Sequence, residues 1–128
     1  MPLSWRQLAS LLGPPGHQGP SGLTLTSPAA GDKLPLLYAW SSLTISEVRA
    51  LVRGTSPAVT FSLRHGTDFS AAGTLVKADG MVATNTTIGD SWSSLDIPEI
   101  PAGSWLWIVV DAVSGTPVSL HTSVRFSM

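Results

Sequence analysis

Val59-Thr60-Phe61-Ser62-Leu63-Arg64 is the stretch that decides the fold. Its apolar residues alternate with polar ones, which is the pattern of a β-strand with one buried face. Farther along, Ser104 to Val110 is apolar on both faces, with Trp105, Trp107 and Val109 on one side. Such a segment predicts a central strand, or one lying between the core and a subunit interface.

Leu43 to Val52 also has the composition of a strand, but its apolar positions change parity partway along. Leu43 and Ile45 are odd-numbered, whereas Val48, Ala50 and Val52 are even-numbered. One extra residue near Ser46-Glu47 would produce this change, so we expect a β-bulge or a break there.

The remaining strand candidates are short and separated by turn residues. Residues 73–77 and 81–88 are bracketed by Asp79-Gly80 and Gly89-Asp90, which indicates hairpins. Residues 117–126 alternate again and form a last strand. Seven or eight short strands without a long helix predict an all-β fold, an antiparallel β-sandwich of the jelly-roll or immunoglobulin-like type.

The N-terminal residues have a different character. Ser4 and Gln7 have the spacing of a capping box, so we expect a short helix within residues 1–12. One stripe of that helix is apolar and consists of Trp5, Leu8, Leu11 and Leu12. Two helical turns are too few to be stable alone. The stripe therefore packs on its own domain, or it anchors the chain to a sister subunit or larger assembly.

Glycine recurs at every third position in the next segment, at Gly13, Gly16, Gly19 and Gly22, with prolines between. A collagen triple helix needs this repeat, and ten residues at about 3.1 Å each would span roughly 30 Å. The segment is too short to trimerise alone. An extended connector, a true triple helix and a simple Gly/Pro linker are the alternatives. The expected order is an anchor helix (residues 1–12), an extended connector and loop (13–34) and a β-sandwich domain (35–128).

Composition excludes several classes of protein. The formal net charge of −1 provides no field to attract nucleic acid, and charged residues make up only 12% of the chain. The absence of cysteine removes disulfides and thiolate chemistry. We expect no signal peptide, because residues 1–12 contain no apolar run of about seven or more. We expect no membrane partner, because no apolar run approaches the ~18 residues of a span. A surface so poor in charge suits packing against other protein.

Candidate catalytic residues are few. His65, Asp68 and His121 are the only grouping that suggests a hydrolytic dyad or a metal pair, and loop hydrogen bonding is the alternative. No nucleophile-elbow, zinc-protease or phosphate-loop motif occurs. We therefore expect no catalytic residues, no metal and no cofactor.

Two further sets of residues suit binding. Arg49, Arg53, Arg64 and Arg125 form one stripe if their strands are neighbours; the alternative is that they are charges that protect sheet edges. Trp92, Trp105 and Trp107 are expected to be core or interface anchors, with a sugar-stacking platform as the alternative.

Several segments together resemble a known type of domain. They are Val48-Arg49-Ala50-Leu51-Val52-Arg53-Gly54-Thr55-Ser56-Pro57, residues 59–68 and 71–74, Ile100-Pro101-Ala102-Gly103-Ser104-Trp105-Leu106-Trp107, and Val113-Ser114-Gly115-Thr116. Over roughly residues 42–127 the chain resembles the β-sandwich domain of virion structural proteins of tailed bacteriophages, of the decoration or fibre type. The resemblance implies a virion component, typically homotrimeric. Collagen-like triplets joined to β-domains are also familiar in phage fibres.

The expected function is accordingly a non-enzymatic virion structural protein, made in the host cytoplasm. Its partners would be sister copies in a homotrimer and other virion proteins of the capsid or tail. A compact capsid-decoration or head-fibre-like protein is favoured over a long fibre because the glycine repeat is short. The alternative is a receptor- or glycan-binding tip domain that uses Trp92 or the loops near His65.

Overall fold

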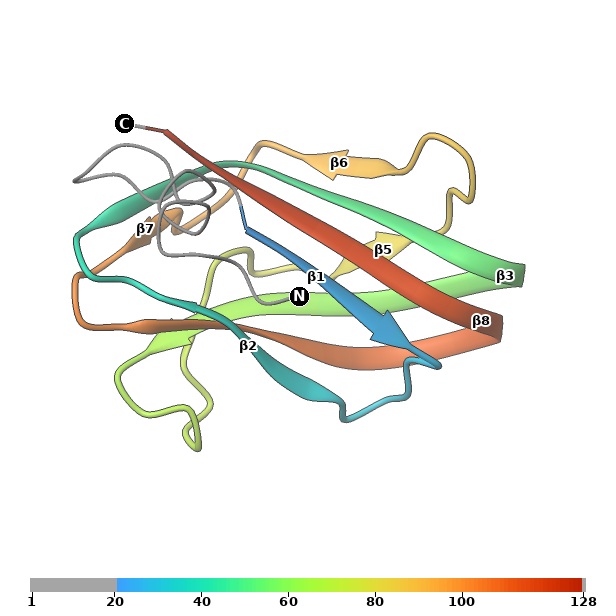
Figure 1. Ribbon diagram of the computed structural model, residues 1–128, viewed down its shortest axis with the longest axis horizontal. Coiled ribbons are helices and arrows are strands. Elements are labelled where there is room, and N and C mark those ends of the chain that lie inside the picture. Colours follow the sequence, from blue (N-terminus) through green and yellow to red (C-terminus); the bar gives the residue numbers. More distant parts are fainter. Residues whose placement is uncertain (1–20, 128) are drawn as a thin grey trace, which may run out of the picture.

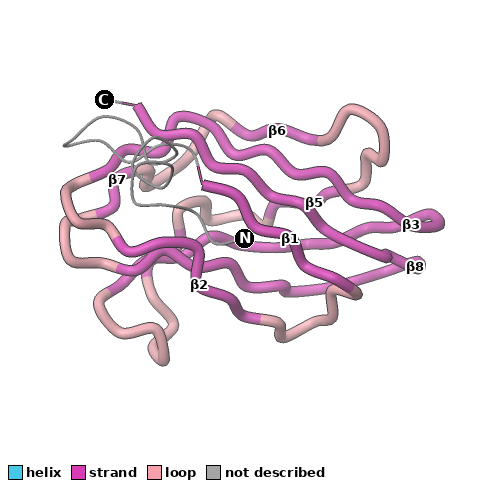
Figure 2. Tube along the Cα trace, in the orientation of Figure 1, coloured by secondary structure: helices cyan, strands magenta, loops and turns pink. Residues whose placement is uncertain are grey.

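The computed structural model of the chain describes residues 21–127, which form antiparallel β-structure and contain no helix (Figure 1; Figure 2). The strands, in chain order, are β1 (Ser21–Thr26), β2 (Lys33–Tyr38), β3 (Leu43–Gly66), β4 (Thr74–Leu75), β5 (Met81–Ala83), β6 (Asp90–Trp92), β7 (Glu99–Ile100) and β8 (Trp105–Ser127).

The two long strands, β3 and β8, organise all the others. They pair antiparallel from Thr44 opposite Ser127 to Gly66 opposite Trp105. The pairing is interrupted near the middle of β3, between Arg53 and Gly54 and again before Ala58. At this point both strands bend, and Figure 1 shows them running to the right-hand end of the molecule and returning from it. Each long strand therefore contributes to two halves of the sheet.

We name these halves after their outer strands. The β1 half contains β1, residues 117–127 of β8 and residues 43–53 of β3, with β6 and β7 along the far edge. The β2 half contains β2, residues 105–114 of β8 and residues 58–66 of β3, with β4 and β5 along the far edge.

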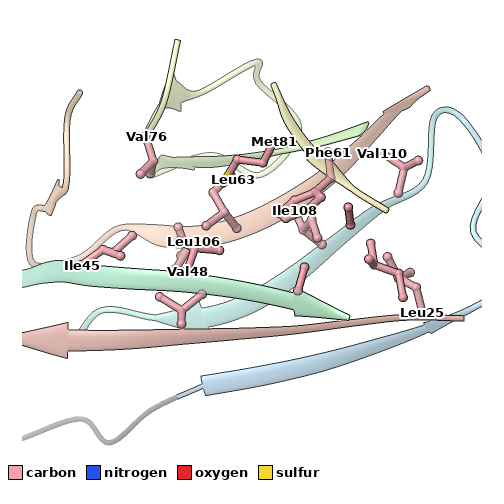
Figure 3. Packing of buried hydrophobic residues seen from close by; sticks show 14 of the residues in the cluster. Leu25, Ile45, Val48, Phe61, Leu63, Val76, Met81, Leu106, Ile108 and Val110 are labelled. Carbon is pink, nitrogen blue, oxygen red and sulfur yellow. The ribbon is translucent and has the colours of Figure 1, made fainter. Parts of the chain in front are cut away.

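The hydrophobic core lies between the two halves. Figure 3 shows Ile45 and Val48 of the β1 half pointing toward Leu63, Leu106 and Ile108 of the β2 half. Of these five, all but Ile45 have no exposed surface, and Ile45 is 3% exposed. Complete burial of such a side chain stabilises the folded state by about 1.5–3 kcal/mol.

The strongest sequence patterns are confirmed. Val59, Phe61 and Leu63 are fully buried, as the alternation predicted. The segment that begins at Trp105 lies between β2 and β3, so it is a central strand. The predicted bulge is also present, because the pairing of β3 with β8 skips from Ile45 to Glu47.

Other expectations differ from the structure. The expected hairpins do not form, because β4, β5 and β6 each pair with β3 and not with one another. The reason is that β3 is 24 residues long and leaves an extended edge of backbone groups for these short strands. The stretches 43–52 and 59–64, expected as separate strands, are one bent strand. The sheet also starts at Ser21, earlier than the boundary at residue 35.

The N-terminal expectations fall mostly on residues that the structure does not describe. The anchor helix (1–12) with Trp5, Leu8, Leu11 and Leu12, and the glycines Gly13, Gly16 and Gly19, lie outside the described residues. Gly22 is described, and it lies in β1 opposite Ser123 of β8.

Candidate binding surfaces

A carboxylate held between two arginines lies on the outer face of the β1 half. Glu47 Oε2 accepts a hydrogen bond from Arg49 Nε at 2.7 Å, and its Oε1 lies 3.4 Å from Nη2 of Arg125. The Arg125 Nε also donates to the hydroxyl of Ser46 at 3.2 Å. Both arginine side chains are 67% exposed, whereas that of Glu47 is 17% exposed. The carboxylate thus fixes two guanidinium groups that still face solvent.

The bulge in β3 determines which side chains reach this face. Before it, odd-numbered residues such as Ile45 point into the core; after it, even-numbered residues such as Val48 do so. A shift of one residue exchanges the two faces of a strand. Without the bulge, Glu47 and Arg49 would point into the core.

Two hollows form a groove along this face. One, of about 250 Å³, is lined by Glu47, Arg49, Ser123 and Arg125. The other, of about 190 Å³, shares Arg49 and Ser123 with it. It adds Leu51, Ile88 and His121 to the lining. We call the two together the arginine groove; Ile88, which is 84% exposed, is its most exposed apolar side chain.

His121 ties β1 to β8 beside the groove. Its Nδ1 lies 3.0 Å from Thr24 Oγ1 and its Nε2 lies 3.1 Å from Ser119 Oγ. Each ring nitrogen lies within hydrogen-bond distance of one of these hydroxyls, so both nitrogens are occupied. The side chain therefore positions strands and has no free nitrogen for a ligand.

His65 and Asp68, the other two residues of the suspected hydrolytic set, lie in different environments. His65 lies on β3 in the β2 half, is 7% exposed, and its Nε2 has no hydrogen-bond partner. Burial lowers the pKa of His65, because charging a desolvated imidazole is unfavourable. The carboxylate of Asp68 accepts hydrogen bonds from Ser70 Oγ at 2.6 Å and from Ser70 N at 2.9 Å, and these lower the pKa of Asp68.

These three residues do not converge. His121 is on the outer face of the β1 half, and no hydrogen bond joins His65 to Asp68. Within residues 21–127, no group of three or more histidines and carboxylates is placed to hold a metal ion. The same residues contain no helix long and apolar enough to cross a membrane.

An aromatic cluster lies where β2 ends and β8 begins. The Tyr38 ring is 4.7 Å from that of Trp40 and 4.9 Å from that of Trp105, both in edge-on contact. Trp40 is 81% exposed and Trp105 is 39% exposed. We refer to Tyr38, Trp40 and Trp105 as the aromatic cluster.

The three tryptophans expected at an interface are in different environments. Trp107 has no exposed surface, because it is covered by the loop after β3. Phe69 of that loop lies 5.4 Å from its ring, and Lys33 Nζ lies 5.1 Å from the ring centre. Trp92 is half-buried and packs edge-on against Phe61 at 5.5 Å. Of the three, Trp105 has the most surface to offer a partner.

Of the two interpretations of the four arginines, the stripe fits three of them. Arg49, Arg53 and Arg125 follow the outward pattern of the β1 half, and Arg53 makes no ion pair with any described residue. Arg64 belongs to the β2 half, where it donates to the carbonyl of Ala72 at 3.2 Å.

Sequence reasoning missed the partners that complete these surfaces. Glu47 was visible only as the position of a bulge, and Ile88 only as the end of a hairpin strand. Tyr38 and Trp40 were visible as the end of the apolar run 35–40; two aromatic residues followed by Ser41-Ser42 were the available signal for an exposed cluster.

Comparison of the chain with protein-family models, with curated proteins and with solved structures finds no match.

Proposed function

We propose that the chain is a non-enzymatic structural protein of a bacteriophage virion, a homotrimeric capsid-decoration or head-fibre-like protein attached through its N-terminal segment. The observation that carries the proposal is the position of β1. This strand starts at Ser21, within the last triplet of the glycine repeat, and Gly22 is itself paired with β8. The repeat thus leads into the sheet without an intervening linker. A triple helix, one of the three alternatives for this repeat, needs three chains, and that alternative supports a homotrimer.

The strand order supports a jelly-roll sandwich as the finer description of the fold. Each half of β3 and β8 is counted here as a strand of its own, β4 and β5 along one edge are counted as one interrupted strand, and β6 and β7 along the other edge as another, which gives eight strands. The β1 half then has the order first, eighth, third, sixth. The β2 half has the order second, seventh, fourth, fifth. This is the order of a jelly roll, an architecture common in viral capsid proteins.

Removing residues 1–20 tests the anchoring role. This truncation leaves β1 complete, so the protein should stay folded, but it should no longer be incorporated into particles. A matched control keeps the full length and replaces only Trp5 and Leu8 by Ala, which should weaken incorporation without shortening the connector. Full occupancy of particles by the truncated protein would contradict attachment through the N-terminus.

Receptor or glycan binding is a second candidate, and the exposed aromatic cluster favours it. Flat rings such as that of Trp40 offer a large contact area at little conformational cost. Trp40→Ala should abolish binding on a glycan array while the fold is retained, since Trp40 is 81% exposed. Trp92 is a poorer test, because its ring packs on Phe61. If the unaltered protein binds no glycan, this candidate fails.

A further inference from the structure

We infer that the arginine groove is the surface through which sister copies associate, and that it receives the β1 edge of the neighbouring copy. This inference rests on the homotrimer proposed above and specifies its interface. The occupant is a second copy of this chain.

The entry point of the connector indicates which face lies at the centre of a trimer. In a triple helix the repeated glycines of all three chains meet at one axis. Because β1 includes Gly22, the three β1 strands would start close to that axis. Gly22 lies opposite Ser123, and Ser123 lines both hollows of the groove. Neighbouring strands are about 4.8 Å apart, so the groove begins one strand away from the point of entry.

The β1 strand provides groups that complement the groove. Among residues 21–127 it pairs only with β8, so within this part of the chain its other edge has backbone carbonyls without a strand partner. Gly22 is exposed and has no side chain, which allows close approach of another chain. The charges of Arg49, Arg125 and Glu47 sum to one positive charge, so the groove attracts the uncharged carbonyl acceptors of a β1 edge. Because each groove would face an edge and not another groove, the three positively charged grooves of a trimer would not repel one another across the interface.

The groove supplies the matching donors in a fixed position. A guanidinium has five N–H donors, and Glu47 and Ser46 engage only part of those of Arg49 and Arg125. Arginines already held in place lose less conformational freedom on binding. Leu51 and Ile88 provide the apolar surface that the centre of an interface needs.

The contact is of the heterologous type, since the edge of one copy meets the face of the next. Such contacts form a closed ring when the rotation between copies closes. With three copies around the axis of the connector, the β1 edge of each copy would lie in the arginine groove of the next. This arrangement also covers the edge of β1 that has no strand partner within residues 21–127, and an uncovered edge is a site of uncontrolled pairing.

Charge reversal in the full-length protein tests the groove. Arg49→Glu and Arg125→Glu should each raise the dissociation constant of the trimer at least about tenfold, because a carboxylate repels the carbonyls of the incoming edge. Ile88→Asp should act in the same direction, and at 84% exposure it should leave the monomer fold intact. Arg53→Glu is the matched control, with the same residue type on the same strand but outside the groove; it should change the constant less than about twofold.

Sedimentation or light scattering over a concentration series provides the readout, with circular dichroism to verify folding. If the unaltered chain is a monomer, the proposed homotrimer fails and the interface with it. If the unaltered chain is a trimer and the groove variants stay as tightly associated, only the assignment of the groove is overturned. An equal effect of Arg53→Glu, or dissociation caused by Trp40→Ser instead, would overturn it as well.

Discussion

His65 is an ionisable side chain held almost wholly inside the β2 half. It is 7% exposed, and its Nε2 has no hydrogen-bond partner. Burial lowers its pKa in the folded protein, whereas in the unfolded chain it titrates near the ordinary histidine value of 6.5. Between those two values the unfolded state binds more protons than the folded state.

The free energy of unfolding should therefore decrease as the pH falls below about 6.5, toward the lower pKa of the folded state. His65→Leu removes the titrating group and should flatten this dependence. It should cost little at neutral pH, because an apolar side chain leaves no buried nitrogen unpaired. Urea denaturation at several pH values measures the effect. A variant whose stability falls with pH as steeply as that of the unaltered protein would contradict the assignment.

At the scale of elements, the bends in β3 and β8 decide how the sheet is divided. Gly54 and Gly115 have φ values of +143° and +69° at these bends, in a region that side chains disfavour. A Cβ on Gly115 would overlap the carbonyl oxygen of Ser56, and one on Gly54 would overlap that of Thr116. The two bends are therefore packed against each other, backbone on backbone, and glycine is needed in both.

Gly115→Ala should destabilise the protein by about 2 kcal/mol or more, since it combines backbone strain with overlap that only the opposite strand can relieve. Gly31→Ala separates the two contributions. Gly31 also has a positive φ, +96°, but nothing lies within 4 Å of its Cβ position. Gly31→Ala should therefore lower the free energy of unfolding by only about 1–2 kcal/mol, the contribution of backbone strain alone. The shift in the urea midpoint measures both, and equal shifts would contradict the argument from packing.

At the scale of the whole molecule, the side chain of Phe61 joins the two halves. It lies on β3 in the β2 half, has no exposed surface, and contacts Trp92 of the β1 half at 5.5 Å. The core between the halves depends on such contacts, because the chain has no disulfide to hold them together.

Phe61→Ala should lower the free energy of unfolding by about 3–5 kcal/mol, through lost burial and the cavity left behind. Phe69→Ala is the matched control. Phe69 is only partly buried and covers Trp107 from outside the core, so its loss should cost clearly less. Calorimetry or urea denaturation compares the two variants. A larger loss for Phe69→Ala would mean that the loop over Trp107 holds the fold more than the core does.

Local patterns predicted the strands well and their pairing poorly. The alternation of Val59, Phe61 and Leu63 was sufficient for a strand, because burial of one face depends on parity alone. The parity change after Ile45 was sufficient for the bulge. The hairpins expected at Asp79-Gly80 and Gly89-Asp90 did not form, because turn residues permit a reversal of the chain but do not choose its partner. That choice depended on the free edge of β3.

The candidate surfaces were predicted even less completely. Arg49 and Arg125 were recognised as members of one stripe, conditional on neighbouring strands. Their common partner Glu47 was not, because Glu47 and Arg125 become neighbours only through the register of β3 with β8. Of the aromatic cluster, Trp105 was singled out, but its contact with Tyr38 and Trp40 depends on where β2 ends against β8.

The sequence by itself determined the strand character of the chain, the bulge in β3 and the low share of charged residues, since these depend on residue type and on spacing within one segment. Only the tertiary structure decided that two bent strands would carry the whole sheet. It also decided that Trp107 would be covered by a loop, that His121 would tie β1 to β8, and that an arginine groove would lie beside β1. The physical reason is that these features depend on pairing between residues far apart in the chain, and the free energy of that pairing comes from the assembled core and not from any single segment.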